Sequence, residues 1–333
     1  MKTKILITGA SGFIGRFLVD DALRRGYEVW AGVRATSSLA HLPQDRIACI
    51  DLKYDDPQRL AGQLEEHVRR HGAWQYVIHN AGLTRTVRRE RFSLVNAEYT
   101  RRLLEALDKA GCRPEKFLLM SSLGSYGAGD EKSFRPVCRD DAQHPETDYG
   151  KSKQLAERYV GRQTAIPYVI LCPTGVYGPG ERDYRMEIQS VRAGFDFAAG
   201  LRPQHLSFIY VKDLSEVAFR ALENPDSRNC RYLVADGKAY TDTEFARLIQ
   251  AVAGRKHVLR LRLPLWTVYL FCLLSETAGR LAGRAVTLNT DKYHILKRRN
   301  WTCDIEPLRR ELDFSPAYDL RRGLEEILRL ETD

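Results

Sequence analysis

The sequence has few of the features that mark specialised protein classes. Its seven cysteines are scattered, with no CxxC pair and no histidine at metal-ligand spacing, which excludes a disulfide scaffold and argues against a zinc site. The first residues form too short an apolar run for a signal peptide. We therefore expect free thiols, no bound metal and a cytoplasmic location.

One stretch is strongly apolar, namely LPLWTVYLFCLL over residues 263–274. It is about a dozen residues long, whereas a membrane-spanning helix needs about 20 apolar residues. We interpret it as a buried helix, or as a lid helix over an apolar pocket. Peripheral membrane contact is the alternative, and the positive charge of the chain would support it.

The charge balance is basic, with a formal net charge of +9 that is spread along the chain and interspersed with acidic residues. No nucleic-acid-binding module accompanies this charge, so we expect no nucleic-acid partner. The apolar fraction of 44% and the aromatic fraction of 10% are typical of a globular protein with a large core. A small-molecule substrate is the expected ligand, and a homodimer is the expected assembly.

The first half of the chain alternates apolar strand patterns with helical patterns, as parallel βαβ units do. The expected strands are residues 4–8, 28–34, 46–51, 76–80, 117–122 and 168–173. The expected helices are residues 12–25, 57–71, 149–163 and one that ends near 111. This order predicts an α/β fold: a Rossmann-type, doubly wound parallel sheet of six strands with a smaller C-terminal substrate lobe.

The alternation of strand and helix patterns weakens after residue 175, where Gly, Pro and charged residues mix with short elements. We expect a dinucleotide-binding domain over residues 1–175 and a mostly substrate-binding lobe over residues 176–333. Segments around 205–225 are expected to return to the main sheet, with a late strand at 206–211 and a helix capped by Asp213.

A glycine-rich turn lies between the first strand and the first helix, with the sequence TGASGFIG at residues 8–15. Gly9 permits a tight turn, Gly12 lets the backbone approach a pyrophosphate, and Gly15 lets helix and strand pack closely. The helix start then presents backbone amides and a partial positive charge to the phosphate. We therefore expect a bound dinucleotide at this turn. The other turn residues expected to contact it are Ser11, Phe13 and Ile14.

The end of the second strand bears on the choice between NAD and NADP. An NAD site commonly has Asp or Glu there to bind the ribose 2′-hydroxyl. The strand instead reads VWAGVR, with no acid and with Arg34 at its end. A guanidinium at that point suits a 2′-phosphate, so NADP is favoured and NAD is the alternative. Arg34 would otherwise stack on the adenine or face solvent.

Two further strand ends are expected to line the cofactor site. Asp51 and Leu52 follow the third strand and are placed to meet the adenine edge. The fourth strand leads into Asn80, Ala81 and Gly82. These are small residues, and they let the backbone pass close to the cofactor.

Tyr149 and Lys153 are four residues apart, which places them one turn apart on one face of a helix. A phenol has an ordinary pKa of about 10 and carries protons poorly at neutral pH. A nearby ammonium is expected to lower that pKa and to make Tyr149 a usable general acid/base. Lys153 is also expected to hydrogen-bond the nicotinamide ribose. Ser122 follows the fifth strand and is expected to orient and polarise the reacting oxygen.

Taken in order along the chain, these motifs resemble those of the extended short-chain dehydrogenase/reductase family, also called the NAD-dependent epimerase/dehydratase family. The resemblance covers nearly the whole chain, and its further motifs are PTGVYGP at 173–179, IYVKD at 209–213 and LDFSP at 312–316. It implies a catalytic triad of Ser122, Tyr149 and Lys153. It also implies that Pro173 lies beside the nicotinamide and that the neighbouring Val176 contacts the cofactor. Asn96 matches a family position whose role is less defined.

Members of this family reduce ketones, oxidise hydroxysteroids, epimerise nucleotide sugars or dehydrate them. Ser122 is followed by LGSYG, with no carboxylate of the kind that 4,6-dehydratases place there, which argues against a dehydratase. The favoured interpretation is a reductase or dehydrogenase acting on a bulky alcohol or ketone. It is similar to the dihydroflavonol-reductase and 3β-hydroxysteroid-dehydrogenase branches in the Val-Arg strand end and in the apolar stretch 263–274.

Two alternatives stay open. A nucleotide-sugar epimerase with tightly bound NAD is suggested by SYG at 125–127 and VYGP at 176–179, which are widespread in sugar enzymes. The second alternative is a catalytically idle, cofactor-bound scaffold, against which the intact triad argues. Basic side chains expected near the site, to meet an acidic substrate group or to remain solvated, are Arg85, Arg88, Arg89 and Arg182.

Overall fold

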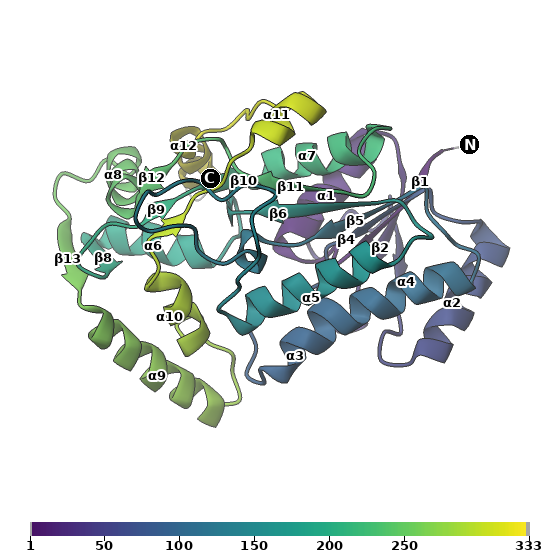
Figure 1. The fold of residues 1–333 in the computed structure, drawn as a ribbon, viewed down its shortest axis with the longest axis horizontal. Coiled ribbons are helices and arrows are strands. Elements are labelled where there is room, and N and C mark those ends of the chain that lie inside the picture. The colour runs from purple at the N-terminus through teal and green to yellow at the C-terminus, as the bar shows by residue number, and fades with distance from the viewer. Residues whose placement is uncertain (1, 331–333) are drawn as a thin grey trace.

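The computed structural model describes residues 2–330, and its centre is a seven-stranded parallel sheet in the order β11-β6-β5-β4-β1-β2-β3 (Figure 1). Inner strands are apolar runs such as FLLM in β5, because helices cover both faces of the sheet. The predicted Rossmann-type sheet is therefore confirmed. The strands are β1 (Lys4–Thr8), β2 (Glu28–Gly32), β3 (Ala48–Ile50), β4 (Tyr76–His79), β5 (Lys116–Met120), β6 (Tyr168–Pro173) and β11 (Cys230–Val234).

Two groups of helices flank this sheet. α1 packs with α7, while α2, α4 and α5 pack side by side (Figure 1). The strand order reverses between β1 and β4, which places the ligand crevice of a doubly wound sheet outside the carboxyl ends of these two strands. The helices are α1 (Phe13–Arg24), α2 (Pro57–His71), α4 (Tyr99–Lys109), α5 (Asp148–Arg162) and α7 (Val211–Glu223).

The sheet has one strand more than the six that the sequence predicts. β11 pairs in parallel with β6, residue for residue from Cys230 opposite Val169 to Val234 opposite Pro173. Its sequence, CRYLV, is short and contains a charged residue, and it lies beyond the part of the chain where strand and helix patterns alternate regularly. The pattern of apolar runs therefore gave no indication of it.

The long helix predicted between β4 and β5 is interrupted at its start. Residues 80–89 have no regular secondary structure, and a single turn, α3 (Glu90–Phe92), follows them. Ser93–Glu98 then form a π-helical turn, η1, before α4 begins. A π turn carries an extra residue per turn and is frequent at functional sites. Here it contains Asn96, which the sequence had singled out.

A second lobe has a core of its own around buried aromatic side chains such as Phe208 and Phe245. In this lobe α8 packs against both α6 and α12. The helices of this lobe are α6 (Asp183–Ala193), α8 (Asp242–Val252) and α12 (Leu320–Leu330), whereas the short α11 (Glu306–Leu312) packs against β11 and α7. The small sheets pair β10 (Phe208–Tyr210) with β7 (Gly175–Tyr177), β12 (Tyr240–Thr241) with β9 (His205–Leu206) and β14 (Asn300–Trp301), and β13 (Leu259–Leu263) with β8 (Phe195–Ala199).

Segment 205–225 meets the main sheet through its helix and not through its strand. Its strand β10 pairs with β7 and does not join the main sheet, because β11 occupies the place beside β6. The segment returns through its helix instead, since α7 packs against β5 and β6. Asp213 does not cap that helix: its carboxylate accepts the backbone amides of Ala317 at 3.2 Å and Tyr318 at 2.9 Å. This carboxylate therefore holds the distant C-terminal segment against α7.

The apolar stretch 263–274 is not a buried helix. It forms the end of β13 and the first part of α9 (Leu265–Leu281), at the edge of the second lobe (Figure 1). α9 packs along one side against α10 (Thr290–Leu296), and its buried residues are only Val268, Cys272 and Gly279. Across residues 2–330, no helix combines the length and the apolar character that crossing a membrane requires.

Candidate functional site

The glycine turn forms a closely packed cradle at the carboxyl end of β1. Gly9 has a φ angle of 66°, and a Cβ atom on it would lie 2.9 Å from the Cα atom of Ala81. A Cβ atom on Gly15 would lie 2.1 Å from the carbonyl oxygen of Gly9. Only glycine fits at these two positions, because the neighbouring atoms belong to the backbone and cannot move aside.

The amino end of α1 is available to an anion. Its N-cap residue is Gly12, and no side chain accepts the first amide groups of the helix. Ser11 precedes this end, and Phe13 and Ile14 are the first two residues of the helix. Unpaired amides and the helix dipole together attract negative charge. These donors therefore fit the pyrophosphate of a dinucleotide.

The residues after β4 connect this cradle to α5. The Ala81 amide donates to the hydroxyl of Thr8 at 3.0 Å, and the Asn80 side chain donates to the carbonyl of Gly9 at 3.4 Å. A Cβ atom on Gly82 would lie 3.2 Å from the Nζ atom of Lys153. The structure thus brings the two glycine-containing turns and Lys153 into one place.

The residues predicted to meet the adenosine end lie after β2 and β3. Arg34 is two residues beyond the end of β2, its side chain is exposed, and no ion pair holds it among the described residues. A turn fixes its backbone, since the Ser37 amide donates to the Arg34 carbonyl at 2.9 Å. Asp51 follows β3 and is paired with Lys53 at 2.5 Å, and the next residue, Leu52, is buried.

Ser122, Tyr149 and Lys153 converge at the carboxyl end of β5. Ser122 caps the short helix η2 (Leu123–Ser125), and its hydroxyl accepts the Gly124 amide at 3.0 Å. The Nζ atom of Lys153 lies 6.0 Å from the centre of the Tyr149 ring. The same ammonium donates to the carbonyl oxygen of Met120 at 2.8 Å.

Helix α5 reaches this position through a close contact with η2. A Cβ atom on Gly150 would lie 2.2 Å from the carbonyl oxygen of Gly124, so a larger residue would push the helix away. Thr147 is the N-cap residue, and its hydroxyl accepts the Gly150 amide at 2.9 Å. The start of the helix and therefore the place of Tyr149 are fixed by these two contacts.

Burial dominates the ionisation of the Tyr149/Lys153 pair. It raises the pKa of Tyr149 to about 12, although a hydrogen bond with the Ser122 side chain acts in the opposite direction. Burial also lowers the pKa of Lys153 to about 8, against the attraction of Glu157. The expected lowering of the phenol pKa is wrong here, because burial is the largest influence on it and raises it.

Asn96 links the loop after β4 to α5. Its side-chain oxygen accepts the Leu83 amide at 2.7 Å, and its amide group donates to the Leu83 carbonyl at 3.0 Å. It also donates to the hydroxyl of Ser152 at 2.9 Å, which in turn donates to the Tyr149 carbonyl at 2.6 Å. The π turn therefore presents a buried amide that holds two parts of the site together.

Two residues beside Tyr149 were missed by the sequence analysis. The ring centre of Phe92 lies 6.1 Å from that of Tyr149. Asp291, in α10, accepts the backbone amides of Asp148 at 2.8 Å and Tyr149 at 3.4 Å. Asp291 is 142 residues from Tyr149 along the chain, so no local pattern could have placed it at the start of α5.

The segment after β6 borders the start of α1. Pro173 is the last residue of β6 and is buried, whereas Val176 lies in β7 and is half-buried. A Cβ atom on Gly178 would lie 3.5 Å from the ring of Phe13. The family motif at 173–179 therefore lies against the first residue of the helix that presents its amides.

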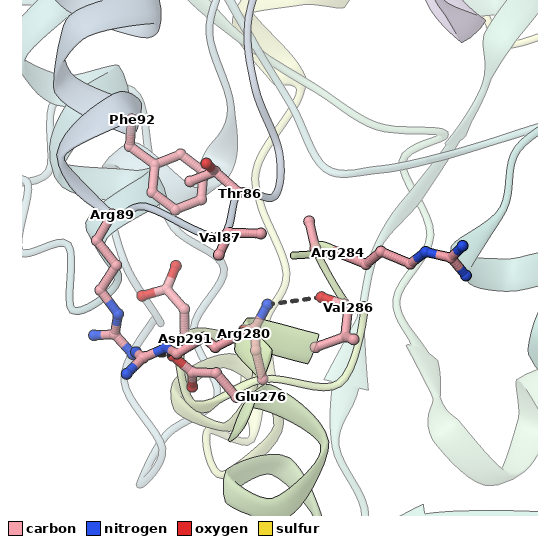
Figure 2. Close-up of a pocket in the computed structure, with 11 residues that line it drawn as sticks. Thr86, Val87, Arg89, Phe92, Glu276, Arg280, Arg284, Val286 and Asp291 are labelled. Atoms are coloured by element: carbon pink, nitrogen blue, oxygen red, sulfur yellow. Dashed lines mark hydrogen bonds and ion pairs between the residues drawn. The ribbon is translucent and has the colours of Figure 1, made fainter. Parts of the chain in front are cut away.

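A small pocket lies between the loop after β4 and α9 (Figure 2). Arg89 lines it and forms ion pairs with Asp148 and Glu276, each at 3.2 Å. Arg85 donates to a threonine side chain of the second lobe at 2.6 Å. These two of the predicted basic residues are thus engaged within the protein. The other two, Arg88 and Arg182, are exposed.

Comparison with known proteins gives these features a family context. The model of the "NAD dependent epimerase/dehydratase family" matches residues 5–235. The chain is 27% identical over 316 residues to the UDP-glucose 4-epimerase of Vibrio cholerae, covering 90% of this chain and 91% of that one. It is 26% identical over 342 residues to the 3 beta-hydroxysteroid dehydrogenase/Delta 5-->4-isomerase of Mycobacterium tuberculosis, covering 98% and 89%. The crystal structure of the UDP-glucose 4-epimerase of Thermotoga maritima shares the fold, with a TM-score of 0.76, 20% identity and coverage of 99% and 100%.

Proposed function

The chain belongs to the NAD dependent epimerase/dehydratase family, and from this premise we propose that it interconverts a ketone and a secondary alcohol on a bulky, largely apolar substrate. The observation that carries the proposal is the meeting of Ser122, Tyr149 and Lys153 beside the glycine cradle. It joins a proton donor, a hydroxyl and an ammonium at the edge of the sheet where a doubly wound fold binds its ligand.

Each of the three side chains has one task in this proposal. A bound nicotinamide would supply or accept the hydride. Tyr149 gives a proton to the carbonyl oxygen as the ketone is reduced, or takes the proton back as the alcohol is oxidised. Ser122 donates a hydrogen bond to that oxygen, and Lys153 binds the ribose. A phenol whose pKa is about 12 is protonated at neutral pH, which suits it to the reducing direction.

NADP is the proposed form of the cofactor. No acidic residue ends β2, and the exposed guanidinium of Arg34 has no ion-pair partner among the described residues. A 2′-phosphate would supply that partner through charge-assisted hydrogen bonds. Titrating the protein with NADPH and NADH tests this. Arg34→Ala should weaken the binding of NADPH only. Arg247→Ala, at an exposed arginine on α8, should change the affinity for neither cofactor. Equal affinities for both cofactors in the unmodified protein would overturn the preference.

The apolar substrate class is supported by the steroid enzyme to which 98% of this chain aligns. The buried ring of Phe92 also packs beside Tyr149 and makes this side of the site apolar. A second candidate is a nucleotide-sugar epimerase, favoured by the similarity to the Vibrio cholerae enzyme over 90% of the chain. Such an enzyme would keep its NAD and show no net change in cofactor.

One assay separates these candidates. The purified protein is supplied with NADPH or NADP and with two substrate panels, UDP-sugars on one side and hydroxysteroids or aryl ketones on the other. Net cofactor turnover with the second panel supports the proposal, whereas sugar interconversion without it supports the epimerase. Cofactor binding without turnover of either panel would indicate a catalytically idle scaffold that binds the cofactor.

The role of Tyr149 is tested in the same assay. Tyr149→Phe removes only the hydroxyl, so turnover should fall by at least about a hundredfold while dinucleotide affinity stays within about twofold. Tyr168→Phe, at the opposite end of the sheet, is the matched control and should keep its turnover. Unchanged turnover in Tyr149→Phe would refute the assignment.

A further inference from the structure

Helix α9 has an unusual division between its two sides. The inner side, with Val268, Cys272 and Gly279, packs towards α10, where the Tyr269 ring also meets Tyr293 at 5.1 Å. The outer side is apolar as well, and it faces solvent. The exposed large side chains of this outer face are Trp266 (70%), Leu270 (47%), Phe271 (60%), Leu273 (41%), Leu274 (58%) and Leu281 (87%). Soluble monomers rarely expose so many contiguous apolar residues without a partner.

A second exposed apolar patch lies on the strands that lead into this helix. β13 pairs with β8 so that Leu259 is opposite Phe195 and Leu261 is opposite Phe197. All four side chains are exposed, by 40% to 55%. Arg260, on the other face of β13, is paired with an aspartate of β8. The outward face of this small sheet is therefore apolar and continues along the chain into α9.

Basic residues outnumber acids in the sequence around these two patches, although Arg260, Arg262 and Arg280 are each paired with an acid. Residues 255–290 contain six Lys or Arg side chains and one acid, Glu276. None of these charges lies within residues 263–275, so the basic residues flank the apolar run on both sides. Lys256 and Arg284 are exposed and have no ion-pair partner among the described residues. Figure 2 shows the Arg284 side chain pointing away from the neighbouring pocket.

We propose that α9, together with the β8–β13 face, docks this protein on an anionic membrane surface. The helix would lie in the interface, with its outer leucines and Phe271 among the acyl chains and the flanking Lys256 and Arg284 at the lipid phosphates. Trp266, near the start of α9, has the amphipathic ring that favours this boundary. The helix has 17 residues and is too short to cross the bilayer.

The charge pattern favours a lipid surface over a second copy of the chain. A twofold interface through α9 would bring the exposed cations Lys256 and Arg284 of one protomer towards the same cations of the other, and no acid among the described residues pairs with either of them. An anionic bilayer presents the opposite sign across a broad surface. This proposal makes no assumption about the reaction, so it stands or falls independently of the proposed function.

Vesicle co-sedimentation tests the proposal with the full chain. We expect binding to vesicles of phosphatidylcholine containing phosphatidylglycerol, and much weaker binding to phosphatidylcholine alone. The double variant Phe271→Glu/Leu274→Glu should lose about tenfold or more in partitioning, because two apolar side chains leave the acyl region. Lys256→Glu/Arg284→Glu should lose the preference for anionic vesicles. Added salt should weaken the binding of the unmodified protein to these vesicles.

Leu330→Glu on α12 is the matched control, since this leucine is 50% exposed and α12 lies away from α9 (Figure 1). It should bind vesicles as the unmodified protein does. All the substituted side chains are exposed, so circular dichroism and dinucleotide binding should stay unchanged in every variant. Absence of vesicle binding by the unmodified protein would overturn the proposal. So would a dimer that the α9 variants convert to a monomer while vesicle binding stays as it was.

Discussion

Replacing Lys153 by methionine should make the folded protein more stable while it removes activity. Lys153 carries an ammonium in a site where it is only 6% exposed, and its one hydrogen-bond acceptor there is the Met120 carbonyl. A methionine side chain has a similar length and no charge. Lys153→Met therefore removes a buried cation without leaving a large cavity.

The size of the effect follows from the pKa of the amine. Burial lowers the pKa of Lys153 from 10.5 to about 8. Because one pKa unit corresponds to about 1.4 kcal/mol, holding this charge at neutral pH costs about 3 kcal/mol of folding free energy. Losing the hydrogen bond to Met120 offsets about 1 kcal/mol of the gain. We expect the free energy of unfolding to rise by about 2 kcal/mol and the Tm by a few degrees.

The pH dependence identifies the cause of this gain. Below pH 8 the amine is protonated in both the folded and the unfolded chain, so the full cost applies. Between pH 8 and pH 10.5 the unfolded chain still holds a proton that the folded chain has lost, so the stability of the unmodified protein rises with pH. The advantage of Lys153→Met should therefore shrink through this interval.

Denaturant unfolding at a series of pH values, with turnover measured beside it, checks both parts. Lys151→Met, an exposed lysine on the same helix, is the control and should change neither stability nor turnover. If Lys153→Met were less stable than the unmodified protein at neutral pH, the lysine would be contributing stability. If its advantage stayed constant from neutral to alkaline pH, the buried charge would not be its source.

Three other substitutions test the structure around the site. Gly15→Ala, whose Cβ would lie 2.1 Å from the Gly9 carbonyl, should lower the free energy of unfolding by several kcal/mol and abolish dinucleotide binding. Gly62→Ala in α2 meets nothing within 4 Å and should raise the free energy of unfolding by up to about 1 kcal/mol. Calorimetry and cofactor titration measure both variants. Burial lowers the pKa of His79 to about 3, so only the unfolded chain takes up this proton as the pH falls below 6.5. His79→Gln should therefore lose less stability in acid than the unmodified protein does, and urea unfolding at several pH values measures the difference. Asp213→Asn should lower the free energy of unfolding by about 1–2 kcal/mol without changing turnover, because one of its two amide hydrogen bonds is lost.

The features that the sequence predicted correctly are those encoded within one short segment. The glycine turn needs only residues 8–15, since the strand, the turn and the helix start follow one another directly. Tyr149 and Lys153 share a helix face because they are four residues apart. The buried parallel strands are recognisable because both their faces are apolar. Local spacing was sufficient in each of these cases.

The features that the sequence analysis missed depend on contacts between distant segments. Asp291 reaches the start of α5 across 142 residues, and the carboxylate of Asp213 binds amides of the C-terminal segment. The apolar character of residues 263–274 suggested a buried helix, but burial requires a neighbour on each side, and α9 packs mainly along one. A hydrophobic pattern shows which residues avoid water and does not show what covers them.

The pKa of Tyr149 depends on such a balance as well. Spacing alone placed an ammonium one turn away and indicated a lowered phenol pKa, yet burial raises it to about 12 and lowers that of Lys153 to about 8. Both changes have one cause, since burial disfavours every charged form. The same burial strengthens each hydrogen bond made to a reacting oxygen. A phenol that keeps its proton until a carbonyl oxygen accepts it therefore needs the burial that makes the neighbouring lysine costly to the fold.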